Sequence, residues 1–235
     1  MADTDVDRYR MKSKPRGICL IIDNINEVPN RAPHKHKLSE TFRKLHFDVQ
    51  FHNQLNDAQF TRVIRRVASV DHETFDCVVV FITAHGDDDV VFTVDDRSFC
   101  IDELASHFKP ENCPSLAGKP KLFFIEACRG EDKQHALKLV DTVDASGATR
   151  FPNEADFFFG YSTVKSFVTY NGWYRKLVAD TFDQKAERDH LLDMMTEVNR
   201  KMSELEHLDD DGSLTIQTSE MTSRLRRKVF FNPET

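Results

Sequence analysis

The sequence predicts an α/β domain built on a sheet of roughly six mostly parallel strands, with helices on both faces. Short runs of branched apolar residues alternate along the chain with segments whose apolar residues recur at helical spacing. Such runs are typical of strands buried on both faces, and their alternation with helices favours parallel pairing through right-handed crossovers. At 235 residues the chain is long enough to form one compact core of this kind.

The first half of the chain supplies three of the predicted strands. Residues 17–24 (GICLIIDN) and 77–86 (CVVVFITAHG) are short apolar runs typical of buried strands, and residues 47–52 (FDVQFH) alternate between apolar and polar. Helices are predicted over residues 36–46 and 57–70, where apolar side chains recur on one face. These elements alternate as a parallel sheet requires.

The second half of the chain continues the alternation after one interruption. Residues 129–155 lack apolar periodicity and are predicted to form a long internal linker. Met194, Met195 and Met202 share a helical spacing that predicts core packing rather than a binding surface. The elements predicted in this half, in chain order, are a hairpin arm at 90–96, a helix within 98–108, strands at 120–128 and 156–163, helices at 172–184 and 190–205, and a final strand at 227–231.

Charge and cysteine content exclude several classes of function. The net charge of -7 argues against nucleic acid, because the basic residues between Arg224 and Lys228 are too few to track phosphates. The five cysteines are odd in number and lack metal-ligand spacing, which predicts free thiols in a reducing compartment. No secretory signal pattern or apolar run of roughly 20 residues is present. We therefore expect a cytoplasmic protein that binds no membrane.

Two reactive side-chain types end predicted strands. His85 ends the strand at 77–86 and Cys128 ends the strand at 120–128, and each is followed by a glycine within two residues. In parallel sheets the carboxyl ends of the strands gather the chemistry. A thiol acts as a nucleophile when a base or acid lies within hydrogen-bond reach. The alternative is a small core cysteine beside a structural histidine.

The segments around these residues carry a family resemblance. FITAHGDDDVVF and KPKLFFIEACRG resemble the caspases, whose nucleophile signature is Gln-Ala-Cys-Arg/Gln-Gly with a histidine upstream. The resemblance continues in the family's order through PRGICLIIDN, LSETFRKLHFDVQ, SLAGKPKLFF, NEADFFFGYST and EVNRKM. It implies a caspase-like three-layer sandwich. Its implied parts are a mobile N-terminal arm (1–16), a large-subunit-like part (17–128), an inter-subunit linker (129–155) and a small-subunit-like part (156–235).

The resemblance also implies roles for individual residues. Cys128 matches the nucleophile and His85 the acid/base, while Gly86 and Cys128 match the backbone donors of the oxyanion hole. No metal or organic cofactor is implied. Asp144 looks like the cleavage site of a zymogen, because it ends an Asp-Thr-Val-Asp sequence before Ala145. The alternative for that stretch is a solvated acidic loop, and the short arm before residue 17 resembles effector-type caspases.

The substrate pocket departs from the family. Caspases hold the substrate aspartate with two arginines and a glutamine, and bidentate guanidinium contacts suit that carboxylate. In this chain Glu126 replaces the glutamine and Asn171 aligns with one arginine. Arg31 lies near the other arginine position but lacks the family's neighbouring residues, and if it fills the pocket we expect it to pair with Glu126. Arg175 is expected on the following helix, and its replacing the missing arginine is the less favoured alternative.

These features leave three hypotheses of function. The first is a regulator or decoy in apoptotic signalling, a pseudoenzyme with weak or absent protease activity. It would pair with an active caspase paralogue or itself through the final strand at 227–231, or compete for an upstream caspase or a caspase inhibitor. The second is an active effector-type cysteine endopeptidase, a thiol protease that cleaves after Asp, in which Arg31, with or without Arg175, rebuilds the pocket. The third is altered specificity, in which Glu126 accepts a basic side chain as acidic pockets do in the metacaspases.

Overall fold

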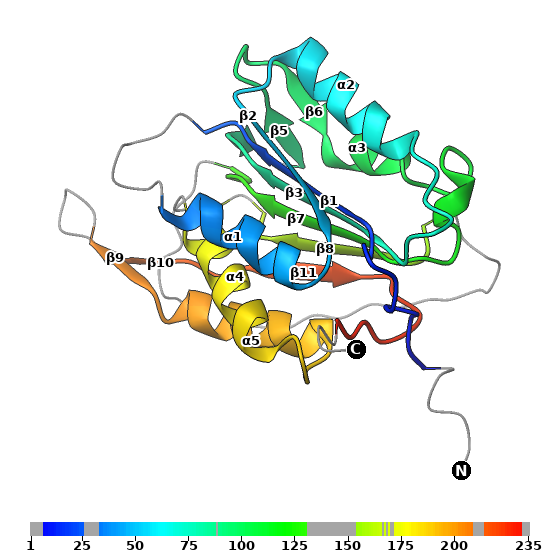
Figure 1. Cartoon of the computed structure of the whole chain (residues 1–235). Helices are drawn as coiled ribbons and strands as arrows, with labels where there is room; N and C mark the ends of the chain where they lie inside the picture. Colours follow the sequence, from blue (N-terminus) through cyan, green and yellow to red (C-terminus); the bar gives the residue numbers. More distant parts are fainter. Residues whose placement is uncertain are drawn as a thin grey trace, which may run out of the picture.

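The computed structural model describes residues 7–25, 33–87, 89–130, 154–165, 167, 169, 172–208 and 214–231. Its main sheet has six strands in the order β11-β8-β7-β3-β1-β2 (Figure 1). All neighbouring pairs are parallel except β11 with β8. The prediction of a mostly parallel sheet of about six strands is confirmed. The strands are β1 (Ile18–Asp23), β2 (Asp48–Asn53), β3 (Val78–Thr83), β7 (Lys121–Glu126), β8 (Phe157–Tyr161) and β11 (Glu220–Ser223).

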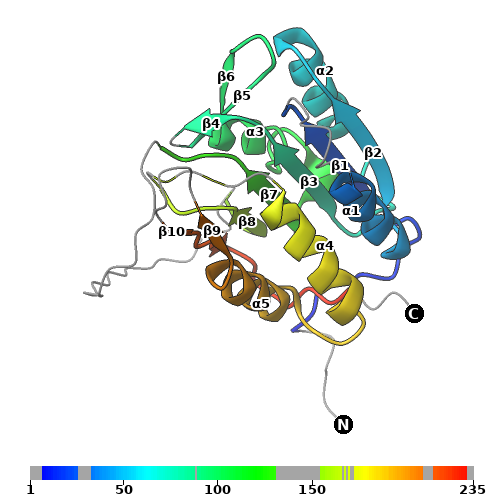
Figure 2. The same cartoon turned by 90° about the vertical axis from the view of Figure 1, so that its left-hand side faces the viewer.

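Helices cover both faces of this sheet, as predicted (Figure 2). Along β3 the side chains alternate between two cores, with Phe81 in one and Val80 in the other. This two-sided burial explains why the central strands are apolar at nearly every position. One face carries α1 (Pro33–Lys44), α4 (Trp173–Lys185) and α5 (Leu191–Ser203), and the other carries α2 (Asp57–Ala68), α3 (Ile101–Ser106) and the 3-10 turn η2 (Pro114–Leu116). Within the described ranges, every helix is too short or too polar to cross a bilayer.

Two small antiparallel sheets extend from this body. The first contains β4 (Gly86–Asp87), β5 (Val90–Phe92) and β6 (Ser98–Cys100), and it matches the predicted hairpin arm after β3. The second is the hairpin of β9 (Glu206–Leu208) with β10 (Leu214–Ile216), which the sequence did not predict. Short strands of three residues carry little periodicity, so the pattern of this hairpin is too weak to recognise in the sequence.

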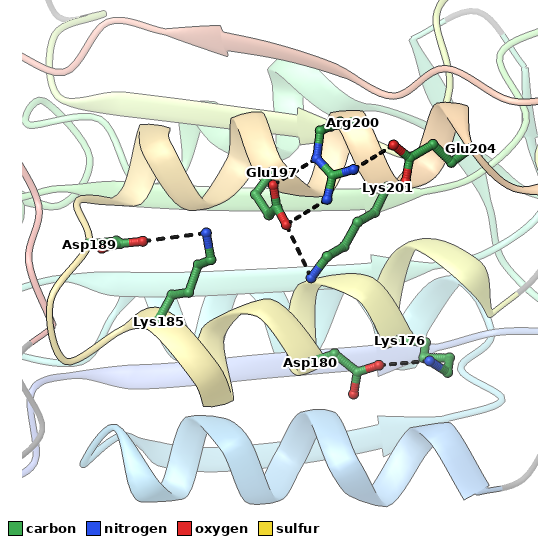
Figure 3. A network of polar contacts seen from close by, with 8 residues as sticks. All are labelled: Lys176, Asp180, Lys185, Asp189, Glu197, Arg200, Lys201 and Glu204. Atoms are coloured by element: carbon green, nitrogen blue, oxygen red, sulfur yellow. Dashed lines mark hydrogen bonds and ion pairs between the residues drawn. The ribbon is translucent and has the colours of Figure 1, made fainter.

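The helix α5 separates its apolar and charged residues by face. Met194, Met195 and Met202 are fully buried, which confirms the prediction of core packing. The outer surface of α4 and α5 carries ion pairs, and a hydrogen bond from Arg200 lowers the pKa of Glu197 to about 2. Exposed pairs of this kind contribute little individually. The pairs drawn in Figure 3 are Lys176–Asp180, Lys185–Asp189, Glu197–Arg200, Glu197–Lys201 and Arg200–Glu204.

The prediction of a mobile N-terminal arm is wrong for residues 7–16. Tyr9 and Met11 are buried in the core, and Arg8 forms a parallel bridge with Lys228 near the other end of the chain. The polar composition of this segment conceals two apolar side chains that are enough to anchor it. Residues 1–6 of the predicted arm lie outside the described residues.

The prediction of a final strand at 227–231 is also wrong. Among the described residues the last strand is β11, which lies at the edge of the sheet and ends at Ser223. Val229 and Phe231 are instead fully buried in the core shared with α1, α4 and α5. Two apolar residues spaced by two are compatible with a strand, but equally with a segment that covers the end of a core.

Tyr9 fastens the N-terminal segment to the start of β8. Its Oη donates a hydrogen bond to Asp156 Oδ1 at 2.6 Å and accepts one from the Arg226 N–H at 2.9 Å. The Arg226 guanidinium donates to both carboxylate oxygens of Asp156, at 2.8 and 2.7 Å. Burial and then the hydrogen bond to Asp156 raise the pKa of Tyr9. A residue near the beginning of the chain therefore holds the start of β8 in place.

Replacing Tyr9 by phenylalanine should lower the free energy of unfolding by about 1.5 to 3 kcal/mol, because a buried carboxylate loses a hydrogen bond. Tyr174→Phe is the matched control. Tyr174 is also buried, but its Oη has no hydrogen-bond partner among the described residues. Removal of the Tyr174 hydroxyl should leave the free energy of unfolding unchanged or raise it. Urea denaturation of both variants measures the difference, and equal losses would contradict this role of Tyr9.

Lys121 is a buried cation at the start of β7. Its Nζ donates to the carbonyl oxygens of Lys119 at 2.8 Å and Leu116 at 3.3 Å. Burial lowers the pKa of Lys121 to about 8, whereas an unfolded chain titrates its lysines near about 10.4. The unfolded state therefore binds more protons between these two values. It follows that this residue makes stability rise with pH across that window.

Lys121→Met should remove that rise, which amounts to about 3 kcal/mol across the whole window. The measurement is the free energy of unfolding of both proteins at about pH 7.5 and about pH 9.5. The free energy of unfolding of the wild type should rise relative to that of the variant at the higher pH, because the buried ammonium group of Lys121 loses its proton. Other titrating groups cancel in the comparison because both proteins contain them. A difference that does not change with pH would refute the assignment.

Candidate active site

His85 and Cys128 lie at the same edge of the sheet because β3 and β7 are paired in parallel. Thr83 is opposite Glu126, and the Ala84 N–H donates to the Glu126 carbonyl oxygen at 3.1 Å. Both His85 and Cys128 follow that pair by two positions, so they leave the sheet side by side. His85 is exposed and Cys128 is half-buried. The structure therefore brings an imidazole and an accessible thiol together at the carboxyl edge.

Gly86 approaches the cysteine backbone closely. A Cβ atom at this position would lie 2.9 Å from the Cys128 carbonyl oxygen and 2.6 Å from the Val90 carbonyl oxygen. Both distances are shorter than real Cβ contacts, so only glycine fits here without a shift of backbone. The backbone at residue 86 is consequently held against the backbone that carries the thiol.

Arg129 fixes the segment that follows the cysteine. Its guanidinium is nearly buried and pairs with Asp89 at 2.9 Å and with Glu220 of β11 at 2.5 Å. It also lies 4.1 Å from the ring centre of Tyr161. Burial raises the pKa of Asp89, but hydrogen bonds from Lys165 and Arg129 outweigh it and lower the value. The backbone next to Cys128 is thus tied to two neighbouring elements, the β4–β5 arm and the edge strand.

Thr169, which follows β8, lies against the thiol. The Thr169 N–H points to Cys128 Sγ at 3.4 Å, and Thr169 Oγ1 accepts a hydrogen bond from Gln217 at 2.7 Å. Gln217 also donates to the Ser162 carbonyl oxygen at 2.6 Å, and Ser162 Oγ donates to the Ala127 carbonyl oxygen at 3.3 Å. These contacts bring residues from both halves of the chain around Cys128.

Glu126 forms a buried polar cluster beneath this edge. Its side chain accepts hydrogen bonds from the Gly172 N–H at 2.8 Å and from Thr83 Oγ1 at 3.2 Å. Arg175 Nε lies 3.5 Å from Glu126 Oε2, an ion-pair contact rather than a hydrogen bond, and Arg175 Nη1 donates to Asp23 Oδ2 at 2.8 Å. All four side chains of the cluster are at most 5% exposed. Two carboxylates therefore share one guanidinium out of contact with water.

Burial dominates the electrostatics of this cluster. It raises the pKa of Glu126, and the Arg175 charge, the Gly172 N–H and the Thr83 hydroxyl oppose that rise without cancelling it. The carboxylate also completes the start of α4. Gly172, the N-cap residue with a φ of 90°, has no side chain to cap the helix. Glu126 supplies the missing acceptor, where the helix dipole favours negative charge.

The comparisons with known proteins agree with this geometry. The model of the caspase domain matches residues 16–230. The chain belongs to the caspase family. It is 34% identical to caspase-8 of Rattus norvegicus over 96% of this chain and 53% of that protein, and thus spans about half of that relative's length. It is 29% identical to caspase-3 of Mesocricetus auratus over 95% of this chain and 86% of that protein. The crystal structure of caspase-1 from Spodoptera frugiperda resembles it with a TM-score of 0.83, at 27% identity, over 98% of this chain and 97% of that one.

The residues expected from the caspase resemblance divide into two groups. The structure places His85, Gly86, Glu126 and Cys128 together at the carboxyl edge. The others fall outside the described residues: Arg31, Asn171 and Asp144.

Arg175 was predicted to lie on the helix after the site, with its entry into the pocket as the less favoured alternative. It does lie on the following helix, α4, as predicted. Its guanidinium nevertheless contacts Glu126 and Asp23, because the first turn of α4 starts over the ends of β1 and β7. Sequence reasoning also missed Thr83 and Asp23. Asp23 had a usable signal, since it ends an apolar strand in the same way as Glu126.

Gly86→Ala tests the close approach beside the caspase cysteine. We expect a loss of about 1 to 3 kcal/mol from overpacking and a changed rate of Cys128 alkylation by iodoacetamide, followed by peptide mass spectrometry. Gly118→Ala is the control. A Cβ there meets no heavy atom within 4 Å, and its φ of 73° makes backbone strain the source of its cost. An unchanged alkylation rate in Gly86→Ala alongside unchanged stability would show that the contact is unimportant.

Proposed function

We propose that this caspase-family chain is a regulator or decoy in cell-death signalling whose own proteolysis after Asp is weak or absent. The observation that carries the proposal is Glu126, a fully buried carboxylate where the family's nucleophile signature has glutamine. A substrate aspartate would meet this carboxylate two residues before Cys128. Arg175 does not remove the conflict, because its charge is already shared with Asp23.

The catalytic groups retain the roles that the family motif gives them. Cys128 attacks the scissile carbonyl carbon as a thiolate, and His85 gives a proton to the leaving amine as the peptide bond breaks. The N–H groups of Gly86 and Cys128 donate to the oxyanion of the tetrahedral intermediate. The shared edge of β3 and β7 supports this arrangement. The proposal therefore assigns low activity to substrate binding and not to the chemical step.

The size of the expected defect follows from the cost of an unpaired buried charge. Removing one partner from a buried charge pair costs roughly 2 to 5 kcal/mol. Each 1.36 kcal/mol corresponds to about tenfold in rate, so the loss lies between roughly thirtyfold and several-thousandfold. A pocket that lacks an arginine and gains a carboxylate belongs near the severe end. An intact dyad does not compensate for a substrate that fails to bind.

An active effector-type endopeptidase is the second candidate. It is favoured by the joint placement of His85, Gly86 and Cys128, which a purely structural protein does not require. In that case Arg31 would have to supply the positive charge for the substrate. Uptake of a basic substrate side chain is less favoured, because Arg175 already occupies the position of a cation next to Glu126.

The partner we propose is an active caspase or a second copy of this chain. The sequence predicted pairing of two chains through a strand at 227–231. Because the strand at the edge of the main sheet is β11, we assign the pairing to β11 instead. Edge strands present unpaired backbone groups to a partner. Cleavage after Asp144 would divide the chain into its two subunit-like parts, and the parallel pairing of β7 with β8 would hold them together. An upstream caspase or a caspase inhibitor are the other partners that fit a decoy.

The cysteines support a cytoplasmic location for this activity. All five are free thiols, including the half-buried Cys100 and Cys128. Free thiols persist in a reducing compartment. A thiolate mechanism also requires that Cys128 stay reduced.

Hydrolysis of aspartyl tetrapeptides tests the proposal. The chain is cut after Asp144 and compared with an effector caspase, with Cys128→Ala as the blank. We expect a rate lower by at least about a hundredfold, from the electrostatic cost above. A rate within about tenfold of the effector caspase would overturn the regulator in favour of the active protease.

Glu126→Gln should increase that hydrolysis by at least about tenfold, because a neutral amide of the same shape removes the repulsion of the substrate carboxylate. Glu73→Gln is the control, since Glu73 is exposed and remote in sequence from both strand ends. The measurement is kcat/KM for an aspartyl peptide, and the gain should appear mainly in KM. An unchanged value would show that the charge of residue 126 does not limit binding.

A further inference from the structure

The contacts of Glu126 have the form of a binding site for a carboxylate. The Gly172 N–H and Thr83 Oγ1 donate hydrogen bonds to its two oxygens from different sides. The Arg175 guanidinium lies against Oε2, and the Arg175 backbone N–H also favours the charged form. These donors come from β3 and from the first turn of α4. They converge on one carboxylate that is fully buried.

Each donor is of a kind that recognises anions. Free N–H groups at a helix N-terminus bind carboxylates, and the helix dipole adds to the attraction. α4 is 13 residues long, and Gly172 at its N-cap contributes no side chain that competes for these groups. A guanidinium and a hydroxyl complete the set. Such a site would bind a free carboxylate if its present occupant were absent.

We infer that Glu126 is an internal ligand, and that the Gly172, Thr83 and Arg175 donors form a latent site for a short carboxylate that Glu126 fills. The inference rests on the proposed function, because it explains how the pocket refuses an aspartate: the carboxylate of residue 126 already takes the donors. The ligand class is a monocarboxylate of two carbons or fewer, matching the part of the Glu126 side chain beyond Cβ.

Arg175 decides the class of ligand that the latent site takes. Removing the Glu126 carboxylate leaves Arg175 with Asp23, its partner at 2.8 Å. The remaining charges within the cluster are then one guanidinium and one carboxylate, while the donors at the start of α4 point toward the vacated space. A cation entering this space would meet Arg175 and two N–H groups. An anion is therefore the favoured occupant.

The experiment is rescue of Glu126→Ala by acetate in the full chain. Acetate has the four heavy atoms that the substitution removes beyond Cβ. The Tm of the variant should rise as sodium acetate replaces sodium chloride at constant ionic strength and neutral pH. Well above its dissociation constant the rise should follow the logarithm of the acetate concentration, with roughly a tenfold change in the folding constant once acetate reaches about ten times that constant. The wild type should show no such rise.

Matched ligands and variants separate this effect from a general effect of the salt. Glu126→Gln keeps the side-chain volume and should not respond to acetate. Acetamide has the shape of acetate without its charge, and should give a much smaller rise in Glu126→Ala. Ethylammonium tests the opposite charge and should give none. An equal response of Glu126→Ala and Glu126→Gln would overturn the inference, as would a greater stabilisation by ethylammonium than by acetate.

A second variant protects the test against a failure to fold. Glu126→Ser removes only the carboxylate group beyond its Oγ, and formate has the three heavy atoms of that group. If Glu126→Ala is unfolded in chloride, a cooperative transition should appear in acetate, and the Tm of Glu126→Ser should rise with formate. Failure of both responses rejects the latent site. Neither readout requires proteolysis, so the hydrolysis test of the wild type still decides the proposed function separately.

Discussion

The parallel pairing of β3 with β7 is the constraint on which the site depends. Its register sets Thr83 opposite Glu126, and every residue after that pair inherits its position. His85 and Cys128 therefore emerge together, while Thr83 and Glu126 stay buried one layer below. A slip of one residue would turn the side chains of one strand to the other face. The apolar side chains of both strands, packed on two faces, prevent that slip.

Because Thr83 and Glu126 are buried, their polar groups must find hydrogen-bond partners within the protein. Polar groups without water need partners inside the protein. The cluster around Glu126 meets this need with the start of α4, and Arg129 meets it for the layer above by joining Asp89 to Glu220. Both solutions use residues far apart in the sequence. Residues of α4 and β11 are thus required to satisfy polar groups of β7 and of the segment that follows it.

The strands, and the edge at which His85 and Cys128 lie, could be predicted from the sequence. The side-chain contacts between elements at that edge could not. The runs at β1, β3 and β7 were predictable because two-sided burial leaves a pattern in every residue. The contact of Arg175 with Glu126 was not, since it depends on how α4 is rotated and where its first turn begins. The predictions of a mobile segment around Tyr9 and of a strand at 227–231 were wrong for a related reason. Isolated apolar side chains mark burial without showing whether the backbone is a strand, and a polar segment can still be anchored by two of them.

Residue 126 places stability and substrate binding in opposition. A carboxylate there caps α4 through Gly172 and pairs with Arg175, so the folded state uses its charge twice. Glutamine would still accept from Gly172 through its amide oxygen, but it would lose the ion pair with Arg175. Glutamine suits an aspartyl substrate because it is neutral. With glutamine at residue 126, however, Asp23 is the remaining carboxylate that pairs with Arg175 in this cluster. The same electrostatic balance that holds the start of α4 in place makes the pocket unfavourable for an acidic ligand.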